Sequence, residues 1–235
     1  MELSSDLVGA RLGRPGSGLL IDLDGTLVLT EAANQQAYRE YFAGRGWQVP
    51  DDVVRAFSGR RAHEVFATVP GPWVDEDPEL LRRGVLRVLA TMDVRPEAVP
   101  GAAELLAACA AGGVPVAVVT SAGRAWTRAA LEALQVAAGT IGLVTSEDYE
   151  HGKPDPEPFR LGARLLGLDP SALVAVEDTP AGIVSARQAG VGLVVGVTTG
   201  RPPEQLRAAG ADRTVPDLTG LAVAVSRTRT QESST

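Results

Sequence analysis

The stretch Leu19-Leu20-Ile21-Asp22-Leu23-Asp24-Gly25-Thr26 decides the fold of this 235-residue chain. Three consecutive apolar residues lead directly into two aspartates at positions i and i+2, and a glycine follows them. In parallel α/β sheets, ligands bind at the carboxyl ends of the strands, which is where these acids would lie. Because side chains alternate along an extended backbone, both carboxylates point to the same side. The stretch therefore predicts a short buried strand that ends at a candidate site.

From about Pro100 onward, apolar strand patterns alternate with helical patterns. The expected strands are Val114–Thr120, Ile141–Val144, Leu173–Val176 and Gly192–Val197. The expected helices are Gly101–Ala111, Arg124–Leu134, Glu157–Leu166 and Ala181–Ala189. Continuous apolar strands joined by helical crossovers indicate a parallel sheet that is covered on both faces. We therefore predict a doubly wound, Rossmann-like α/β fold.

Residues 31–96 follow a different pattern, because their apolar positions recur at helical spacing and no strand pattern interrupts them. Asp77 followed by Pro78 marks the start of the last of these helices. We predict an inserted, all-helical cap over the strand ends. The core would then comprise residues 18–30 and 97–225, with residues 1–17 and 226–235 as flexible tails.

Composition limits the classes of function. The hydrophobic fraction of 45% allows a sizeable core, and the formal net charge of −7 argues against a nucleic-acid partner. The single cysteine, Cys109, excludes an internal disulfide and lies in an apolar helical stretch, so we expect it in the core. No apolar run approaches the roughly 20 residues that span a bilayer. We expect a cytoplasmic protein without a membrane partner, either a monomer or a small homo-oligomer.

Three further polar segments follow predicted strands or lie in the loops after them. Thr120-Ser121 could hold phosphate oxygens, although hydroxyls commonly end strands. Lys153 lies among a glycine and three prolines, which could fix its cation near a phosphate or leave it in an exposed loop. Glu177-Asp178 could cap a helix or bind Mg²⁺ together with Asp22. Each signal is weak alone, but their order along the chain favours phosphoryl transfer.

With these motifs the chain resembles the haloacid dehalogenase superfamily, over about Leu19 to Leu221, and within it the phosphatases with a helical cap. The resemblance implies that Asp22 is the nucleophile and a metal ligand, and that Asp24 is the general acid/base, whose backbone carbonyl also binds the metal. Thr120 and Lys153 would hold the phosphoryl oxygens, with Leu23 and Ser121 beside them. Asp178 would bind Mg²⁺ directly and Glu177 would lie in its first or second shell. The implied substrate is a small phosphorylated metabolite.

The subgroup of the superfamily that this chain resembles is inferred both from positions that match the family motifs and from positions that differ from them. Leu29-Thr30 stands where many relatives have Asp-Ser, and the segment from Ser58 to Ala62 is similar to a cap motif of glycerol-3-phosphatases and 2-deoxyglucose-6-phosphatases. A sugar- or polyol-phosphate phosphatase is therefore expected. Arg60 and Arg61 are candidate substrate contacts, with Arg61 favoured because it matches the similar motif. Trp126 is expected to serve packing only.

Other functions remain open. A β-phosphoglucomutase-like mutase would share all four motifs but carry a histidine early in the first cap helix, where this chain has Asn34. A non-catalytic binding member of the family is also possible in principle, although every motif residue is present. A phosphonate hydrolase would need a cap lysine, and Thr30 to Glu97 contains none. A dehalogenase is disfavoured by Asp24 and by the acid pair at Glu177-Asp178.

Overall fold

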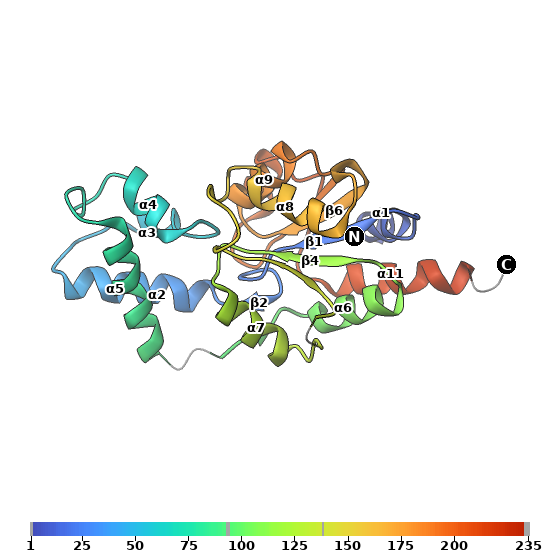
Figure 1. Ribbon diagram of the computed structural model, residues 1–235, viewed down its shortest axis with the longest axis horizontal. Helices are drawn as coiled ribbons and strands as arrows, with labels where there is room; N and C mark the ends of the chain where they lie inside the picture. The colour runs from blue at the N-terminus through green and yellow to red at the C-terminus, as the bar shows by residue number, and fades with distance from the viewer. Residues whose placement is uncertain (1, 93–94, 138, 233–235) are drawn as a thin grey trace.

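The computed structural model describes residues 2–92, 95–137 and 139–232, and it is built around a six-stranded parallel sheet (Figure 1). The strand order is β5-β4-β1-β6-β7-β8. The strands are β1 (Gly18–Ile21), β4 (Val116–Val119), β5 (Gly142–Val144), β6 (Leu173–Glu177), β7 (Leu193–Val197) and β8 (Arg213–Val215). The central strand β1 pairs with β4 on one side and β6 on the other, so that Leu20 lies opposite both Ala117 and Ala175. The predicted fold class is confirmed.

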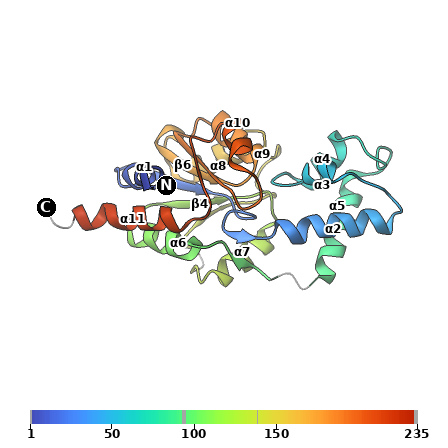
Figure 2. The same ribbon diagram turned by 180° about the vertical axis from the view of Figure 1, so that it is seen from behind.

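Helices cover both faces of this sheet, because successive strand side chains point in opposite directions. Leu19 and Ile21 pack towards one helical layer, whereas Leu20 packs towards the other. The first layer is formed by α1 (Glu2–Leu12), α6 (Ala102–Ala111), α7 (Arg124–Ala133) and α11 (Thr219–Glu232). The second layer, at the top of Figure 2, is formed by α8 (Glu157–Leu166), α9 (Pro180–Gln188) and α10 (Pro203–Ala208). Cys109 is buried in the first layer, as expected.

The expected flexible tails at 1–17 and 226–235 are wrong for most of the residues that the structure describes. Helix α1 spans Glu2–Leu12, and its Val8 and Leu12 are only 1% and 3% exposed. These two side chains lie one helical turn apart, so both reach the core beneath the sheet. Helix α11 continues to Glu232 and packs against α1 and α6. Residues 233–235 lie outside the described part of the chain.

Along the described residues, four helices lie between β1 and α6: α2 (Glu31–Gly44), α3 (Asp51–Arg55), α4 (Ala62–Thr68) and α5 (Pro78–Thr91). They form their own hydrophobic cluster, in which Phe42 and Trp73 stack with ring centroids 5.2 Å apart. Asp77 caps α5 by accepting a hydrogen bond from the backbone N–H of Glu79 at 2.8 Å. These four helices thus share a hydrophobic cluster of their own, and we call α2–α5 the cap.

A two-stranded antiparallel ribbon lies where the chain leaves the core and returns to it. Strand β2 (Val28–Leu29) pairs with β3 (Glu97–Ala98), with Val28 opposite Ala98. The sequence pattern did not predict this ribbon, because two residues are too few to establish an alternation. The cap therefore joins the core through two neighbouring strands (Figure 1). Among the helices of the described residues, none is long and apolar enough to cross a membrane.

Candidate functional site

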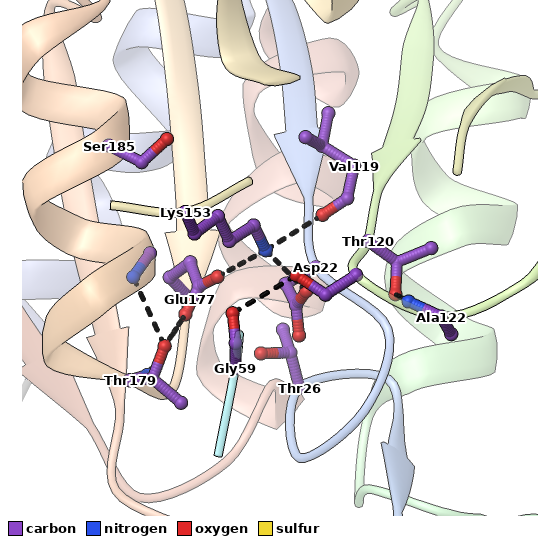
Figure 3. Close-up of polar contacts among 12 residues, drawn as sticks. Asp22, Thr26, Gly59, Val119, Thr120, Ala122, Lys153, Glu177, Thr179 and Ser185 are labelled. Carbon is purple, nitrogen blue, oxygen red and sulfur yellow. Dashed lines mark hydrogen bonds and ion pairs between the residues drawn. The ribbon is translucent and has the colours of Figure 1, made fainter. Parts of the chain in front are cut away.

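The carboxyl ends of three neighbouring strands bring the predicted residues together. Asp22 follows β1, Thr120 follows β4, and Glu177 and Asp178 end or follow β6. Lys153 reaches the same place from the long loop between β5 and α8. All five side chains are buried, with at most 4% of each residue exposed. The four segments singled out in the sequence thus meet at one point of the sheet edge (Figure 3).

Lys153 lies between two of the acids. Its Nζ donates to Asp22 Oδ1 at 2.6 Å, to Glu177 Oε1 at 2.5 Å and to the backbone carbonyl of Val119 at 2.9 Å. These acceptors satisfy all three donors of the ammonium group. Burial alone would lower the pKa of Lys153, but the charges of Asp22 and Glu177 outweigh it and the pKa is raised. The site therefore holds a fixed positive charge beside Asp22.

The acids outnumber this cation. Oxygens of Asp22, Glu177 and Asp178 all lie within 4.8 Å of one another. Burial raises the pKa of Asp22 to about 7, against the opposing effect of Lys153. Burial, followed by the charges of Glu177 and Asp22, raises the pKa of Asp178 well above its usual value. Three carboxylates against one ammonium leave an excess of negative charge, which a divalent cation with oxygen ligands would offset.

Both oxygens of Glu177 already have partners. Oε1 accepts from Lys153, and Oε2 accepts from the backbone N–H and the hydroxyl of Thr179, each at 2.9 Å. Thr179 in turn caps α9, because its Oγ1 accepts from the backbone N–H of Gly182 at 3.2 Å. Glu177 is therefore held as a support for Lys153, which leaves Asp22 and Asp178 as the better candidates for direct metal ligands.

Gly25 permits the close approach of two strand ends. Its φ is +89°, and a Cβ at this position would lie 2.1 Å from Asp178 Oδ2. Any other residue would collide with the carboxylate and adopt an unfavourable backbone conformation. The neighbouring Thr26 donates its hydroxyl to Asp178 Oδ1 at 3.4 Å. The glycine seen in the sequence thus allows the first loop to pass directly over Asp178.

Asp24 receives two hydrogen bonds on one oxygen. The Thr30 hydroxyl donates to Oδ1 at 2.7 Å and the Trp126 indole N–H donates to the same atom at 3.0 Å. Burial raises the pKa of Asp24, while these two hydrogen bonds act in the opposite direction. The interpretation of Trp126 as a packing residue was therefore incomplete. Nothing in the sequence connects it with Asp24, since the two are 102 positions apart.

The hydroxyl residues after β4 have separate partners. Thr120 Oγ1 accepts from the backbone N–H of Ala122 at 3.0 Å, which orders the turn after the strand. The Thr120 carbonyl accepts from the Tyr149 hydroxyl at 3.0 Å. Ser121 Oγ donates to the backbone carbonyl of Gly59, a cap residue, at 3.1 Å. Thr120 thus lies beside the acids, whereas Ser121 contacts the cap.

Arg60 and Arg61 lie between α3 and α4, in the segment predicted from the sequence. Nη2 of Arg60 donates to the Thr68 hydroxyl at 3.5 Å, within the cap. Nη1 of Arg61 donates to Glu64 Oε1 at 3.1 Å and to the backbone carbonyl of Glu150 at 2.7 Å. The Nε atoms of both arginines are buried and have no hydrogen-bond partner among the described residues. Buried unpartnered donors are rare, so these atoms suit a ligand.

A cleft of about 920 Å³ separates the cap from the core. Its core wall includes Asp22, Asp24, Thr120 and Trp126. Its cap wall mixes apolar residues, such as Phe57, Val85, Leu86 and Leu89, with the polar residues Asn34, Tyr38, Arg60, Arg61, His63 and Arg82. The site therefore combines a buried ionic centre with a roomy chamber of mixed polarity above it. Such a chamber fits a small organic group with several hydrogen-bonding atoms.

Fold and site together define an α/β enzyme with a buried acid–lysine centre under a helical cap. The chain belongs to the haloacid dehalogenase-like hydrolase family, which it matches over residues 19–196. It is 38% identical over 202 residues to validoxylamine A 7'-phosphate phosphatase of Streptomyces hygroscopicus subsp. limoneus, covering 85% of this chain and 93% of the relative. It is 35% identical over 173 residues to hexitol phosphatase A of Escherichia coli K12, covering 74% and 79%.

Solved structures agree on the fold. A hydrolase from Pseudomonas syringae superposes with a TM-score of 0.80 at 24% identity. The superposition covers 90% of this chain and 98% of the other chain. The arrangement of sheet, helical layers and cap is therefore shared with a solved hydrolase structure.

Proposed function

We propose that this protein is a Mg²⁺-dependent phosphatase that hydrolyses a sugar or polyol phosphate through an aspartyl-phosphate on Asp22. The observation that carries the proposal is the buried pair of Lys153 and Asp22 beside two further acids, at the floor of the cleft between core and cap. The two relatives, named as a phosphatase of validoxylamine A 7'-phosphate and a hexitol phosphatase, support this substrate class.

The first half of the reaction uses Asp22 as the nucleophile. Its Oδ1 is held by Lys153, so Oδ2 is the oxygen that attacks phosphorus. As the Asp22–phosphorus bond forms, the bond from phosphorus to the ester oxygen breaks. Asp24 gives its proton to the departing alkoxide, and its raised pKa favours the protonated form that this step needs. Oδ2 of Asp24 is the donor, because Oδ1 is occupied by Thr30 and Trp126.

The second half returns the enzyme to its starting state. A water molecule attacks phosphorus while Asp24, now deprotonated, takes its proton. The Asp22–phosphorus bond breaks and inorganic phosphate leaves. Throughout, Lys153 offsets the repulsion between the Asp22 carboxylate and the phosphate oxygens. Thr120, Ser121 and the backbone N–H of Leu23 are the proposed phosphate contacts beside Lys153.

The residues present fit a divalent cation. Asp22, Asp178 and the backbone carbonyl of Asp24 would hold it, and Glu177 would support the site through Lys153. Mg²⁺ is proposed because it binds through one or two carboxylates and keeps several waters. When bound, it would neutralise charge on the phosphate.

The cap residues Arg60 and Arg61 are the proposed contacts for the rest of the substrate. Both line the cleft, and the unpartnered Nε–H of each guanidinium would donate a hydrogen bond to a ligand oxygen. A planar guanidinium can bind two neighbouring hydroxyls at once. This arrangement favours a polyhydroxylated ester over an apolar one.

Phosphate release from a panel of sugar, polyol, glycolate and nucleotide monophosphates tests the proposal. Sugar or polyol phosphates should give the highest kcat/KM, and excess EDTA should stop the reaction. A transfer of the phosphoryl group to another position of the same sugar, without release of phosphate, would instead indicate a mutase. Undiminished activity in EDTA would contradict the metal requirement.

A further inference from the structure

In the described structure the cap contacts the core at several places away from the ribbon that joins them. The core residue Arg201 donates to Glu31 Oε1 and to the backbone carbonyl of Arg55, and two other contacts involve loops that carry proposed site residues. In the first, Gly59 of the cap lies against Ser121 and Thr179, and Figure 3 shows it among the core residues below Asp22. In the second, the cap residues Arg61 and Glu64 contact the core loop that precedes Lys153. We call these two contacts together the docking seam.

The second contact consists mainly of hydrogen bonds between cap side chains and the backbone of the core loop. Glu64 Oε1 accepts from the backbone N–H of Gly152 at 2.9 Å and from Arg61 Nη1 at 3.1 Å. Arg61 Nη1 donates to the backbone carbonyls of Glu150 and Tyr149 at 2.7 and 3.3 Å. The Arg61 guanidinium also lies over the Tyr149 ring, 5.2 Å from its centroid. One cap ion pair thus binds both donors and acceptors of a single core loop.

Two glycines make this close approach possible. A Cβ on Gly152 would lie 2.8 Å from both Arg61 Cδ and Glu64 Oε2. A Cβ on Gly59 would lie 2.4 Å from Thr179 Oγ1, and the φ of Gly59 is +70°. One glycine belongs to the core and the other to the cap, so both sides of the seam lack side chains where they meet. The fit indicates a specific contact between the two surfaces.

The loop held by the seam leads directly to the catalytic centre. Gly152 is bonded to Lys153, whose ammonium is fixed at its other end by Asp22, Glu177 and Val119. At the other end of the loop, the Tyr149 hydroxyl donates to the Thr120 carbonyl. The cap therefore contacts a segment that supports two of the proposed phosphate-binding residues.

We propose that Glu64 is a positioning residue: by accepting the Gly152 N–H, it fixes the backbone from which Lys153 reaches Asp22. The side chain of Lys153 is then held at both ends, at Nζ by the core and at its backbone by the cap. Lys153 has full alignment only when the cap is docked. This inference rests on the proposed phosphatase function for its effect on rate, but not for the contact itself.

Glu64 differs from an ordinary surface ion pair. The Arg61 and Glu64 side chains are 15% and 24% exposed, and Glu64 has a backbone partner across the seam. The cap also contains the pair Arg45 and Glu76, whose side chains are 38% and 37% exposed. Exposed pairs contribute little to stability. Glu76→Ala is therefore a matched control that removes a cap carboxylate away from the seam.

The experiment compares Glu64→Ala, Glu64→Gln and Glu76→Ala with the wild type. Glu64→Ala should lower kcat about tenfold, with little change in KM, for both a sugar phosphate and p-nitrophenyl phosphate. The loss should be the same for both because Lys153 acts on the phosphoryl group that they share. Glu64→Gln keeps an oxygen that accepts the Gly152 N–H and should recover most of kcat. Glu76→Ala should stay within about twofold of the wild type.

Amide hydrogen exchange gives a readout that does not depend on catalysis. In Glu64→Ala the Gly152 amide should exchange at least about tenfold faster, while the amides of Glu150 and His151, which donate to Glu157, should change less. Unchanged Gly152 exchange, or an unchanged kcat, would overturn this inference. A wild-type protein that releases no phosphate from any ester would overturn the proposed function while the exchange result still tests the seam.

Discussion

The core and cap walls of the cleft are built differently. In the core, Lys153, Asp22 and Glu177 are almost wholly buried, and the three donors of the Lys153 ammonium have partners at 2.5–2.9 Å. In the cap, Arg60 and Arg61 are partly exposed and each keeps a buried Nε without a partner in the described structure. The core wall is therefore preorganised for one chemical step, whereas the cap wall has bonding capacity left for a variable ligand.

The largest expected effect comes from replacing the proposed nucleophile in the core wall of the cleft. Asp22→Asn should reduce phosphate release at least about a thousandfold, because the amide cannot form the acyl phosphate. The change is almost isosteric, so circular dichroism should show an intact fold. Asp52→Asn, at an exposed position of α3, is the control. If Asp22→Asn keeps a tenth of the wild-type turnover, Asp22 is not the nucleophile.

The second-largest effect should come from the loss of a proposed metal ligand. Asp178→Asn should lower activity about a hundredfold or more at a fixed Mg²⁺ concentration, since the direct carboxylate ligand is lost. Titration of activity with Mg²⁺ after treatment with EDTA measures the effect. Ca²⁺ should support turnover poorly, because it favours more ligands and looser geometry. Equal Mg²⁺ dependence in variant and wild type would exclude Asp178 as a ligand.

A smaller effect should come from the hydrogen bond between Trp126 of helix α7 and Asp24. Trp126→Phe keeps the ring but removes the indole N–H, and should lower kcat about tenfold. If Trp126 acts through Asp24, the same substitution should have little further effect in an Asp24→Asn protein. Trp47→Phe, in the cap cluster, serves as the control. Additive losses in the double variant would show that Trp126 acts elsewhere.

Substitution of each cap arginine in turn should distinguish an effect on substrate binding from an effect on the contact between cap and core. Arg60→Ala should lower kcat/KM for the best sugar phosphate several-fold while sparing p-nitrophenyl phosphate, because the Arg60 guanidinium donates to Thr68 within the cap and not to the core loop. Arg61→Ala should lower activity on both esters, because it removes the seam as well. Kinetics on both substrates measure the difference. If neither variant loses activity, both arginines are surface residues.

The smallest expected effect is on stability. The raised pKa values of Asp22, about 7, and Asp178 mean that the metal-free folded state holds protons that the unfolded chain releases near pH 4. This site should therefore destabilise the metal-free protein increasingly as pH rises from about 4 through 7. In EDTA at pH 8, Asp178→Asn should raise the unfolding midpoint by about 2–4 °C. A lower midpoint than that of the wild type would contradict this reasoning.

The parallel core could be predicted because most of its strands are apolar runs followed by polar residues, as at Leu173–Val176, whereas β8, with the sequence Arg-Thr-Val, lacks this pattern and was not predicted. Asp22, Thr120 and Glu177 could be singled out as candidates for the same reason, since they lie at strand ends, whereas Lys153 lies in the long loop between β5 and α8. Trp126, by contrast, contacts Asp24 only because the start of helix α7 meets the loop after β1 in space. Helix α1 was missed because its local pattern is weak, although Val8 and Leu12 reach the core. Pairings between distant segments leave no periodic signal along the chain.

The docking seam was beyond prediction for a related reason. Gly152 and Gly59 each look like ordinary loop glycines in the sequence. Their importance comes from the atoms that face them, Arg61 and Thr179, which belong to the other part of the molecule. Arg61 could be singled out from the sequence, but its bonds to the core loop could not.

The ribbon of β2 and β3 bears on how this molecule acquired its cap. Because Val28 and Ala98 lie opposite each other, the chain departs from the core and re-enters it at one spot. The segment between the two strands forms a loop whose ends are neighbours. The entropic cost of closing such a loop grows only slowly with the number of residues in it. A cap of another size could therefore be inserted at this ribbon without changing the register of the sheet. The same core site could then act on different esters.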